Sequence, residues 1–182
     1  MTLVDLLYSI TTGPERRRRL LAAIVLAIFV SVLLLVLLAS RFVDRVLALP
    51  GLLPGATGAS IGTALLAGGL ALWSWSFALF RGKGIPVNPP RELVTNGPYA
   101  WLRNPMLLGL WLALLGLGFL LHSVALVFLG TPAVVAATII ELKLVEEPEL
   151  ERRLGPAYKR YKADVPMFIP RRPSSRHEVS RK

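Results

Sequence analysis

The sequence has no cysteine and only two histidines among its 182 residues. Without cysteine the chain has no disulfide bonds, no thiolate zinc site and no cysteine nucleophile. Acidic residues are also few, with 11 Asp and Glu against 21 Lys and Arg, so the formal net charge is +10. A basic balance can indicate nucleic-acid binding, but here the basic residues lie between and beyond long apolar runs. We therefore expect a lipid bilayer as the partner, and no nucleic acid.

Long apolar runs dominate what is present. The chain is 54% hydrophobic, and its runs predict transmembrane helices at about residues 20–40, 59–80, 106–121 and 124–145. In residues 20–39, 15 of the side chains are Leu, Ile, Val or Phe, which favours insertion by about 5–9 kcal/mol. This run is longer than the apolar core of a cleaved signal peptide, about 7–15 residues. The expected fold class is all-α, a polytopic membrane protein with four transmembrane helices.

Small and polar residues suggest how these helices pack. Ser60, Ala64 and Gly68 recur at a spacing of four, which predicts a face where another helix approaches closely. His122 and Ser123 alone separate the third and fourth runs, so a tight helical hairpin is expected. Pro132 should kink the fourth helix, because proline lacks the N–H that an α-helix requires.

The basic residues predict the orientation. Nineteen of the 21 lie in segments on one side of the predicted spans, and only Arg41 and Arg45 lie on the other. By the positive-inside rule, both termini and the long loop after the second span are cytoplasmic. Residues 1–172 would form one multi-pass domain in the cytoplasmic or inner membrane. Residues 2–10 predict a short interfacial helix, and residues 173–182 a loose polar tail.

Two cytoplasmic segments carry the polar residues that chemistry needs. Residues 81–105 contain five prolines, which predicts an ordered, irregular loop rather than a helix. Residues 146–170 begin with clustered glutamates around Pro148, so we expect a helix to begin there. A second short helix should follow Gly155 and carry Tyr158 and Tyr161. We expect the two segments to pack together into a cofactor pocket, although the loop alone could also be a rigid connector.

The stretch ELVTNGPYAWLRNPMLLG resembles the motif of the isoprenylcysteine carboxyl methyltransferase and phospholipid methyltransferase superfamily. That motif reads approximately LV-x-x-G-x-Y-x-x-x-R-H-P-x-Y-x-G. The second half of the pattern is similar too: a Glu pair at 146–147, G-x-x-Y-x-x-Y from Gly155, and V-P-x-x-x-P from Val165. The likeness covers about residues 81–170, half of the chain.

This resemblance implies a membrane enzyme that uses S-adenosylmethionine. Glu146 could bind the cofactor's ammonium or ribose hydroxyls, and Arg103 or Asn104 its carboxylate. Tyr99 or Trp101 could lie against the adenine or the sulfonium. No metal is implied. The candidate catalytic residues are Arg103, Glu146 and Glu147, and the candidate cofactor-binding residues are Arg91, Glu92, Leu93, Val94, Tyr99, Asn104, Pro105, Met106, Leu107 and Glu146.

Three positions depart from the family pattern. The family His is Asn104 here, which can donate a hydrogen bond but cannot act as a general base. The family Tyr is Leu107. In the prenylcysteine enzymes an Arg that faces the substrate carboxylate stands four residues before the equivalent of Glu146, and that position is Leu142 here. Carboxyl methylation of a prenylated cysteine is therefore poorly supported.

The leading hypothesis is methyl transfer to a lipid-like or small carboxylate, amine or thiol acceptor at the cytoplasmic membrane face. Such a displacement needs positioning and a dry pocket more than acid–base chemistry. Two alternatives stay open. One is an NADPH-dependent membrane reductase of related fold, and the other is a non-catalytic membrane protein that retains the fold.

Overall fold

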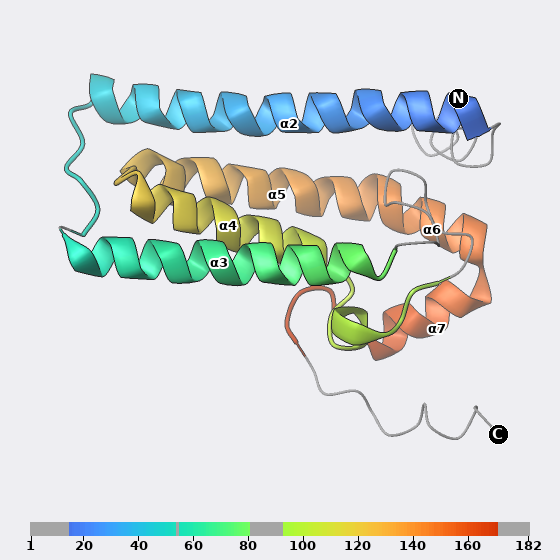
Figure 1. The fold of residues 1–182 in the computed structure, drawn as a ribbon. Coiled ribbons are helices and arrows are strands. Elements are labelled where there is room, and N and C mark those ends of the chain that lie inside the picture. Colours follow the sequence, from blue (N-terminus) through green and yellow to red (C-terminus); the bar gives the residue numbers. More distant parts are fainter. Residues whose placement is uncertain (1–14, 54, 81–92, 171–182) are drawn as a thin grey trace.

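The computed structural model describes residues 15–53, 55–80 and 93–170. Within these ranges all regular structure is helical and there is no strand (Figure 1). The long helices are α2 (Glu15–Val46), α3 (Ala56–Ala78) and α4 (Pro105–Leu120), followed by a continuous helix, Leu126–Leu154, that contains α5 (Thr131–Glu141) and α6 (Glu147–Leu154). The shorter α7 (Pro156–Asp164) and the 3₁₀ turn η1 (Gly97–Ala100) lie at one end of the bundle. The all-α prediction is confirmed for this part of the chain.

Three of these helices are long and apolar enough to cross a membrane: Ala23–Val46 within α2, α3, and Leu126–Leu154. Helix α4 is apolar but has 16 residues, or about 24 Å of helix, against a hydrocarbon core of about 30 Å. The protein is thus an integral membrane protein, while its fourth span stays a prediction. The predicted interfacial helix at 2–10, residues 81–92 of the loop and the tail at 173–182 lie outside the described residues.

Helices α3 and α4 are in close contact through glycines. A Cβ added at Gly69 would lie 2.5 Å from the carbonyl oxygen of Gly109, and one at Gly62 would lie 2.9 Å from that of Gly116. These distances leave no room for a side chain, so only glycine permits the approach. The pairing of an early residue of α3 with a late residue of α4 also shows that the two helices run antiparallel (Figure 1).

The small-residue face predicted for α3 is therefore wrong. A Cβ added at Gly68 would meet nothing within 4 Å, and Ser60 and Ala64 are exposed. The contact uses glycines seven residues apart rather than small residues four apart. A seven-residue spacing keeps one face toward an antiparallel neighbour along two helical turns.

Each proline in the last long helix follows a π-helical segment. Leu126–Gly130 precedes Pro132, and Leu142–Glu146 precedes Pro148. A proline ring clashes with the carbonyl four residues earlier and has no N–H to bond it, and that carbonyl belongs to Phe128 or Leu144, inside the π-helical segment. The wider turn of a π-helix moves this carbonyl away from the ring. The helix predicted to begin near Pro148 is consequently a continuation of the fourth apolar run.

The hairpin predicted at His122 and Ser123 is confirmed. Helix α4 ends at Leu120, and the next helix starts at Val124 after three intervening residues. His122 takes the left-handed conformation with φ 51°, which allows the chain to reverse within so short a turn.

We predict that Gly69→Ala destabilises the protein by about 1–3 kcal/mol, because the added methyl group would push apart two helix backbones. Gly68→Ala is the matched control. It should be neutral, or stabilising by up to about 1 kcal/mol, because alanine favours a helix over glycine. Unfolding of both variants in detergent micelles measures the difference. Equal stability of the two would contradict the packing described.

Candidate functional site

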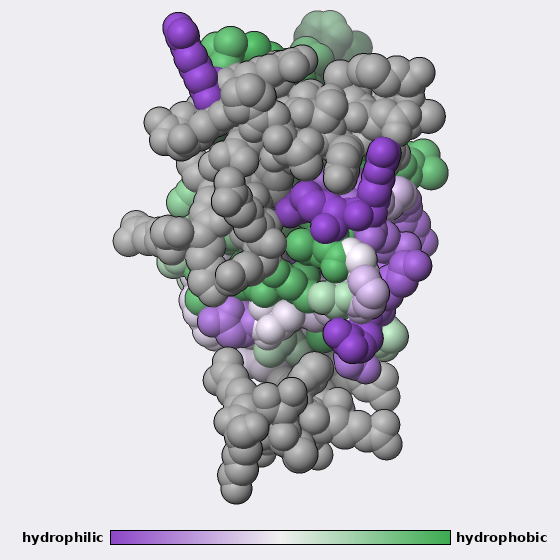
Figure 2. All heavy atoms as spheres, turned by 90° about the vertical axis from the view of Figure 1, so that its right-hand side faces the viewer, coloured by the Kyte–Doolittle hydropathy of each residue, from purple (hydrophilic) through white to green (hydrophobic). Residues whose placement is uncertain are grey.

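The two polar segments predicted to meet do so in the described part of the chain. Leu93 packs against a cluster of Tyr158, Tyr161 and Val165. The backbone N–H of Arg103 donates to the carbonyl of Pro166 at 2.9 Å. Seen from this end of the molecule, hydrophilic side chains gather beside apolar ones (Figure 2). The predicted packing of residues 93–105 against the C-terminal segment is thus confirmed, while the cofactor pocket itself stays a prediction.

A glycine turns the chain back over the site. Gly155 has φ 58° and separates α6 from α7, a conformation that costs glycine little. Pro156 then begins α7, where a missing N–H is harmless. Because of this reversal, α7 lies against the segment around η1, and the Tyr161 hydroxyl donates to the carbonyl of Tyr99 at 2.8 Å.

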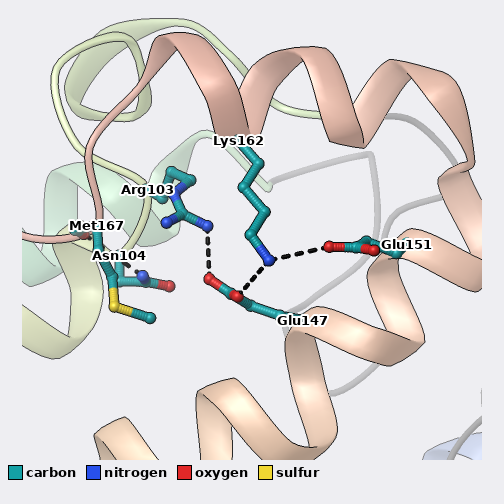
Figure 3. Close-up of polar contacts among 6 residues, drawn as sticks. All are labelled: Arg103, Asn104, Glu147, Glu151, Lys162 and Met167. Atoms are coloured by element: carbon teal, nitrogen blue, oxygen red, sulfur yellow. Dashed lines mark hydrogen bonds and ion pairs between the residues drawn. The ribbon is translucent and has the colours of Figure 1, made fainter.

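The centre of the site is a set of ion pairs on Glu147 (Figure 3). Arg103 Nη1 lies 2.5 Å from Glu147 Oε1, and Lys162 Nζ lies 2.6 Å from Glu147 Oε2. Lys162 also reaches Glu151 Oε1 at 2.9 Å. The Arg103 and Glu147 side chains are only 11% and 10% exposed, so this pair is shielded from water. These four residues, which we call the Glu147 network, join α6, α7 and the loop before α4.

Charge and burial favour the charged form of Lys162 and the neutral form of the nearby tyrosines. The hydrogen bond to Glu147 raises the pKa of Lys162, which keeps the ammonium charged. Burial raises the pKa of Tyr161 and of Tyr99, so both hydroxyls stay neutral and able to donate. Burial also raises the pKa of Tyr158, with the nearby Arg103 acting in the opposite direction.

Glu146 is not a member of the Glu147 network, although it directly precedes Glu147. It is the last residue of the π-helical segment and is partly buried. Its negative charge adds to burial and Tyr161 in raising the pKa of Tyr99, so the carboxylate lies within electrostatic reach of that ring. The role of Glu146 in binding a cofactor stays a prediction.

Arg103 has donor capacity left over. Its Nε is buried and makes no hydrogen bond within the described residues. Buried donors in native proteins normally have partners, and a guanidinium is the best match for a carboxylate or phosphate. This nitrogen is therefore a candidate donor to an anionic ligand group.

The C-terminal segment after α7 lies across the start of α4. The backbone N–H and the side-chain amide of Asn104 donate to the carbonyl of Met167 at 3.3 and 3.4 Å. Phe168 packs on Trp111 with ring centroids 4.4 Å apart. Asn104 replaces the family histidine, and its side-chain amide adds one hydrogen bond to the one that its backbone makes to this segment.

The other candidate residues differ in their surroundings. Val94, Tyr99 and Pro105 are buried close to the network residues in sequence. Leu107 instead packs into the apolar core of the bundle around Trp111, Leu114 and Val134. Trp101 is 41% exposed and packs edge-on against Trp75. Met106 follows in the first turn of α4, and Arg91 and Glu92 lie outside the described residues.

Sequence reasoning missed Lys162, although it identified Tyr161 beside it. Lys162 is four residues after Tyr158, so the two share a face of α7. That spacing was the available signal. What could not be read from the sequence was the fold-back at Gly155, which brings this face onto Glu147.

The long apolar helices and the shielded network at one end define an integral membrane protein with a built polar site. The family of phospholipid methyltransferases (PEMT) matches residues 58–157, more than half of the 182-residue chain. The chain belongs to this family, which confirms the resemblance noted in its motifs and implies a membrane methyltransferase. Comparison with curated proteins and with solved structures gives no match.

We predict that Glu147→Gln lowers the free energy of unfolding by about 3–5 kcal/mol, because it leaves Arg103 buried without its counter-charge. Glu151→Gln is the matched control, since the Glu151 side chain is 33% exposed and such pairs contribute about 0–1 kcal/mol. Urea or thermal unfolding in micelles measures both. If the two variants lose the same stability, the Glu147 network is not the structural centre of this end.

Proposed function

We propose that the protein transfers a methyl group from S-adenosylmethionine to a lipid-like or small acceptor at the cytoplasmic face of the membrane. The observation that carries the proposal is the Glu147 network. It joins the two halves of the methyltransferase motif, Arg103 from the first and Glu147 from the second, through a contact 2.5 Å long. The pairing brings polar residues of both halves to one place, where a single cofactor could contact both.

The residues at this end of the bundle fit the cofactor's groups. The unpartnered Nε of Arg103 suits the carboxylate of the methionine moiety. Glu146 suits the α-ammonium or the ribose hydroxyls, and the buried ring of Tyr99 offers an apolar face to adenine. The remaining candidates (Arg91, Glu92, Leu93, Val94, Asn104, Pro105, Met106 and Leu107) would contribute through their backbone or by shaping the pocket.

The chain's own contribution is positioning. When bound, the cofactor would supply a methyl group on a sulfonium, and an acceptor lone pair would form the new bond as the carbon–sulfur bond breaks. Holding the two reactants in line removes much of the entropic barrier. Asn104 cannot serve as a base, so a proton released by the acceptor would go to water or to a carboxylate such as Glu146.

One residue, Leu142, limits which chemical classes of acceptor the site could bind. Leu142 stands where the prenylcysteine enzymes have a carboxylate-facing arginine, and it is 2% exposed. An acceptor that needs a cation at that point is disfavoured. A lipid-like acceptor agrees with the membrane helices, and a carboxylate held elsewhere, an amine or a thiol all remain compatible.

We predict that S-adenosylmethionine binds the purified protein and that Glu146→Gln weakens this binding by at least about tenfold, since a buried charged hydrogen bond is worth about 1.5–3 kcal/mol. Glu141→Gln, which removes an exposed carboxylate from the same helix, is the matched control. Titration calorimetry measures affinity, and transfer of labelled methyl to a lipid extract measures activity.

Other outcomes of the same titration separate the alternatives. Binding of NADPH instead would indicate a reductase, and binding of neither would indicate a non-catalytic protein. Unchanged cofactor affinity in Glu146→Gln, with a clear loss of stability in the absence of ligand, would make Glu146 structural.

The orientation follows from the charge asymmetry and can be tested because the chain has no native cysteine. Thr57 and Thr95 are both exposed: Thr57 lies in the first turn of α3, and Thr95 lies just before η1, whose Gly97 contacts the opposite end of α3 at Leu79. We predict that a cysteine at Thr57 reacts with a membrane-impermeant maleimide in intact cells and that one at Thr95 reacts only after permeabilisation. The reverse pattern would place the site on the outer face.

A further inference from the structure

Helix α2 is attached to the bundle by a polar clamp near its C-terminal end. Arg41 Nη1 donates to the carbonyl of Leu121 at 2.6 Å, at the end of α4. Asp44 accepts the backbone N–H of Ala125 at 2.8 Å and the hydroxyl of Ser123, at the start of the next helix. A cation thus meets the negative end of one helix and an anion the positive end of the other.

The apolar contact of α2 lies just before this clamp. Gly130 lies against α2 so closely that an added Cβ would be 2.6 Å from Ser40 Oγ and 3.1 Å from Val36 Cγ1. Leu33 and Val36 pack on the core around Trp111. Among the residues that the structure describes, these contacts hold only the C-terminal part of the helix.

On the side of α2 that faces the bundle, the solvent exposure of the side chains rises with distance from the clamp. Residues 26, 29, 33, 36 and 40 recur at spacings of three and four, so they share one side of α2. Ser40 is 5% exposed, Leu33 and Val36 are partly buried, Phe29 is 37% exposed and Leu26 is 52% exposed. The side of α2 that packs on the bundle at one end is therefore uncovered at the other.

We propose that α2 is anchored at the Arg41–Asp44 clamp and splays from the bundle toward its N-terminal end, and that acyl chains of bilayer lipids fill the wedge so formed. The wedge opens at the end of the bundle where α6 lies (Figure 1), and thus toward the Glu147 network. This inference does not depend on the proposed methyl transfer.

The chemistry of the face identifies the occupant as lipid. Ala23–Val46 is a candidate membrane span, and its uncovered side at Leu26 and Phe29 is apolar and offers no hydrogen-bonding group. The exposed Arg16 lies before the apolar stretch, where it would meet headgroups. Within a bilayer, an apolar side chain loses nothing against hydrocarbon, so lipid contact leaves this half of α2 without a force that draws it inward.

Single nitroxide labels in reconstituted bilayers test the wedge. The protein has no native cysteine, so labels can be placed one at a time. Leu26→Cys and Val36→Cys report the bundle-facing side, and Ile28→Cys and Leu38→Cys report the outward side near the same two depths. We expect equal oxygen accessibility at Leu26 and Ile28, but much lower accessibility at Val36 than at Leu38.

The proposal would be overturned if Leu26 were less accessible to oxygen than Ile28 by as much as Val36 is less accessible than Leu38. That result would mean that another part of this chain, a second copy or a different protein covers Leu26. Asp44→Ala tests the clamp separately. It should raise oxygen accessibility at Val36 toward the value at Leu38 and leave Leu26 unchanged. Arg45→Ala, an exposed neighbour, is the control and should change neither.

Discussion

The polar end of the molecule depends on the shielding of one carboxylate. Glu147 leaves the apolar part of the last helix with a side chain that is 10% exposed, and such a group requires cations at hydrogen-bonding distance. Its two partners come from the loop before α4 and from α7, so satisfying it brings three separate segments together. Tyr161 and the backbone pairing of Arg103 with Pro166 then follow from that assembly.

Much of the bundle could be predicted because hydrophobic runs report directly on membrane helices. The hairpin at His122 and the helix break at Gly155 were also readable, since both are local, whereas the direction that the chain takes after Gly155 was not. The contact between α3 and α4 could not be predicted from the sequence. Gly68 and Gly69 look alike in sequence, and only the position of α4 decides which of them is buried. Likewise, the length of α2 beyond its apolar run depends on its contacts with the hairpin.

The region of the site could be predicted from the sequence, but not which glutamate forms the ion pair. The motif placed Arg103 and a glutamate pair near each other, and the structure assigns the ion pair to Glu147. A regular α-helix is assumed when faces are read from spacing, and the π-helical segment Leu142–Glu146 breaks that assumption just before the pair. Lys162 was missed for a different reason, because no local pattern relates it to a residue on another helix.

The two π-helical segments have a consequence for comparing this chain with others. Each π turn holds about one residue more than an α turn, and one residue corresponds to about 100° of rotation around a helix axis. Past the second segment, the last helix is therefore turned by about 200° relative to an uninterrupted α-helix of the same length. A relative that lacked the extra residue of one π turn would differ from this chain by a single deletion in the helix. It would nevertheless present a different side chain to the polar end. Insertions and deletions of a single residue within Leu126–Gly130 or Leu142–Glu146 are thus equivalent to rotating everything that follows them.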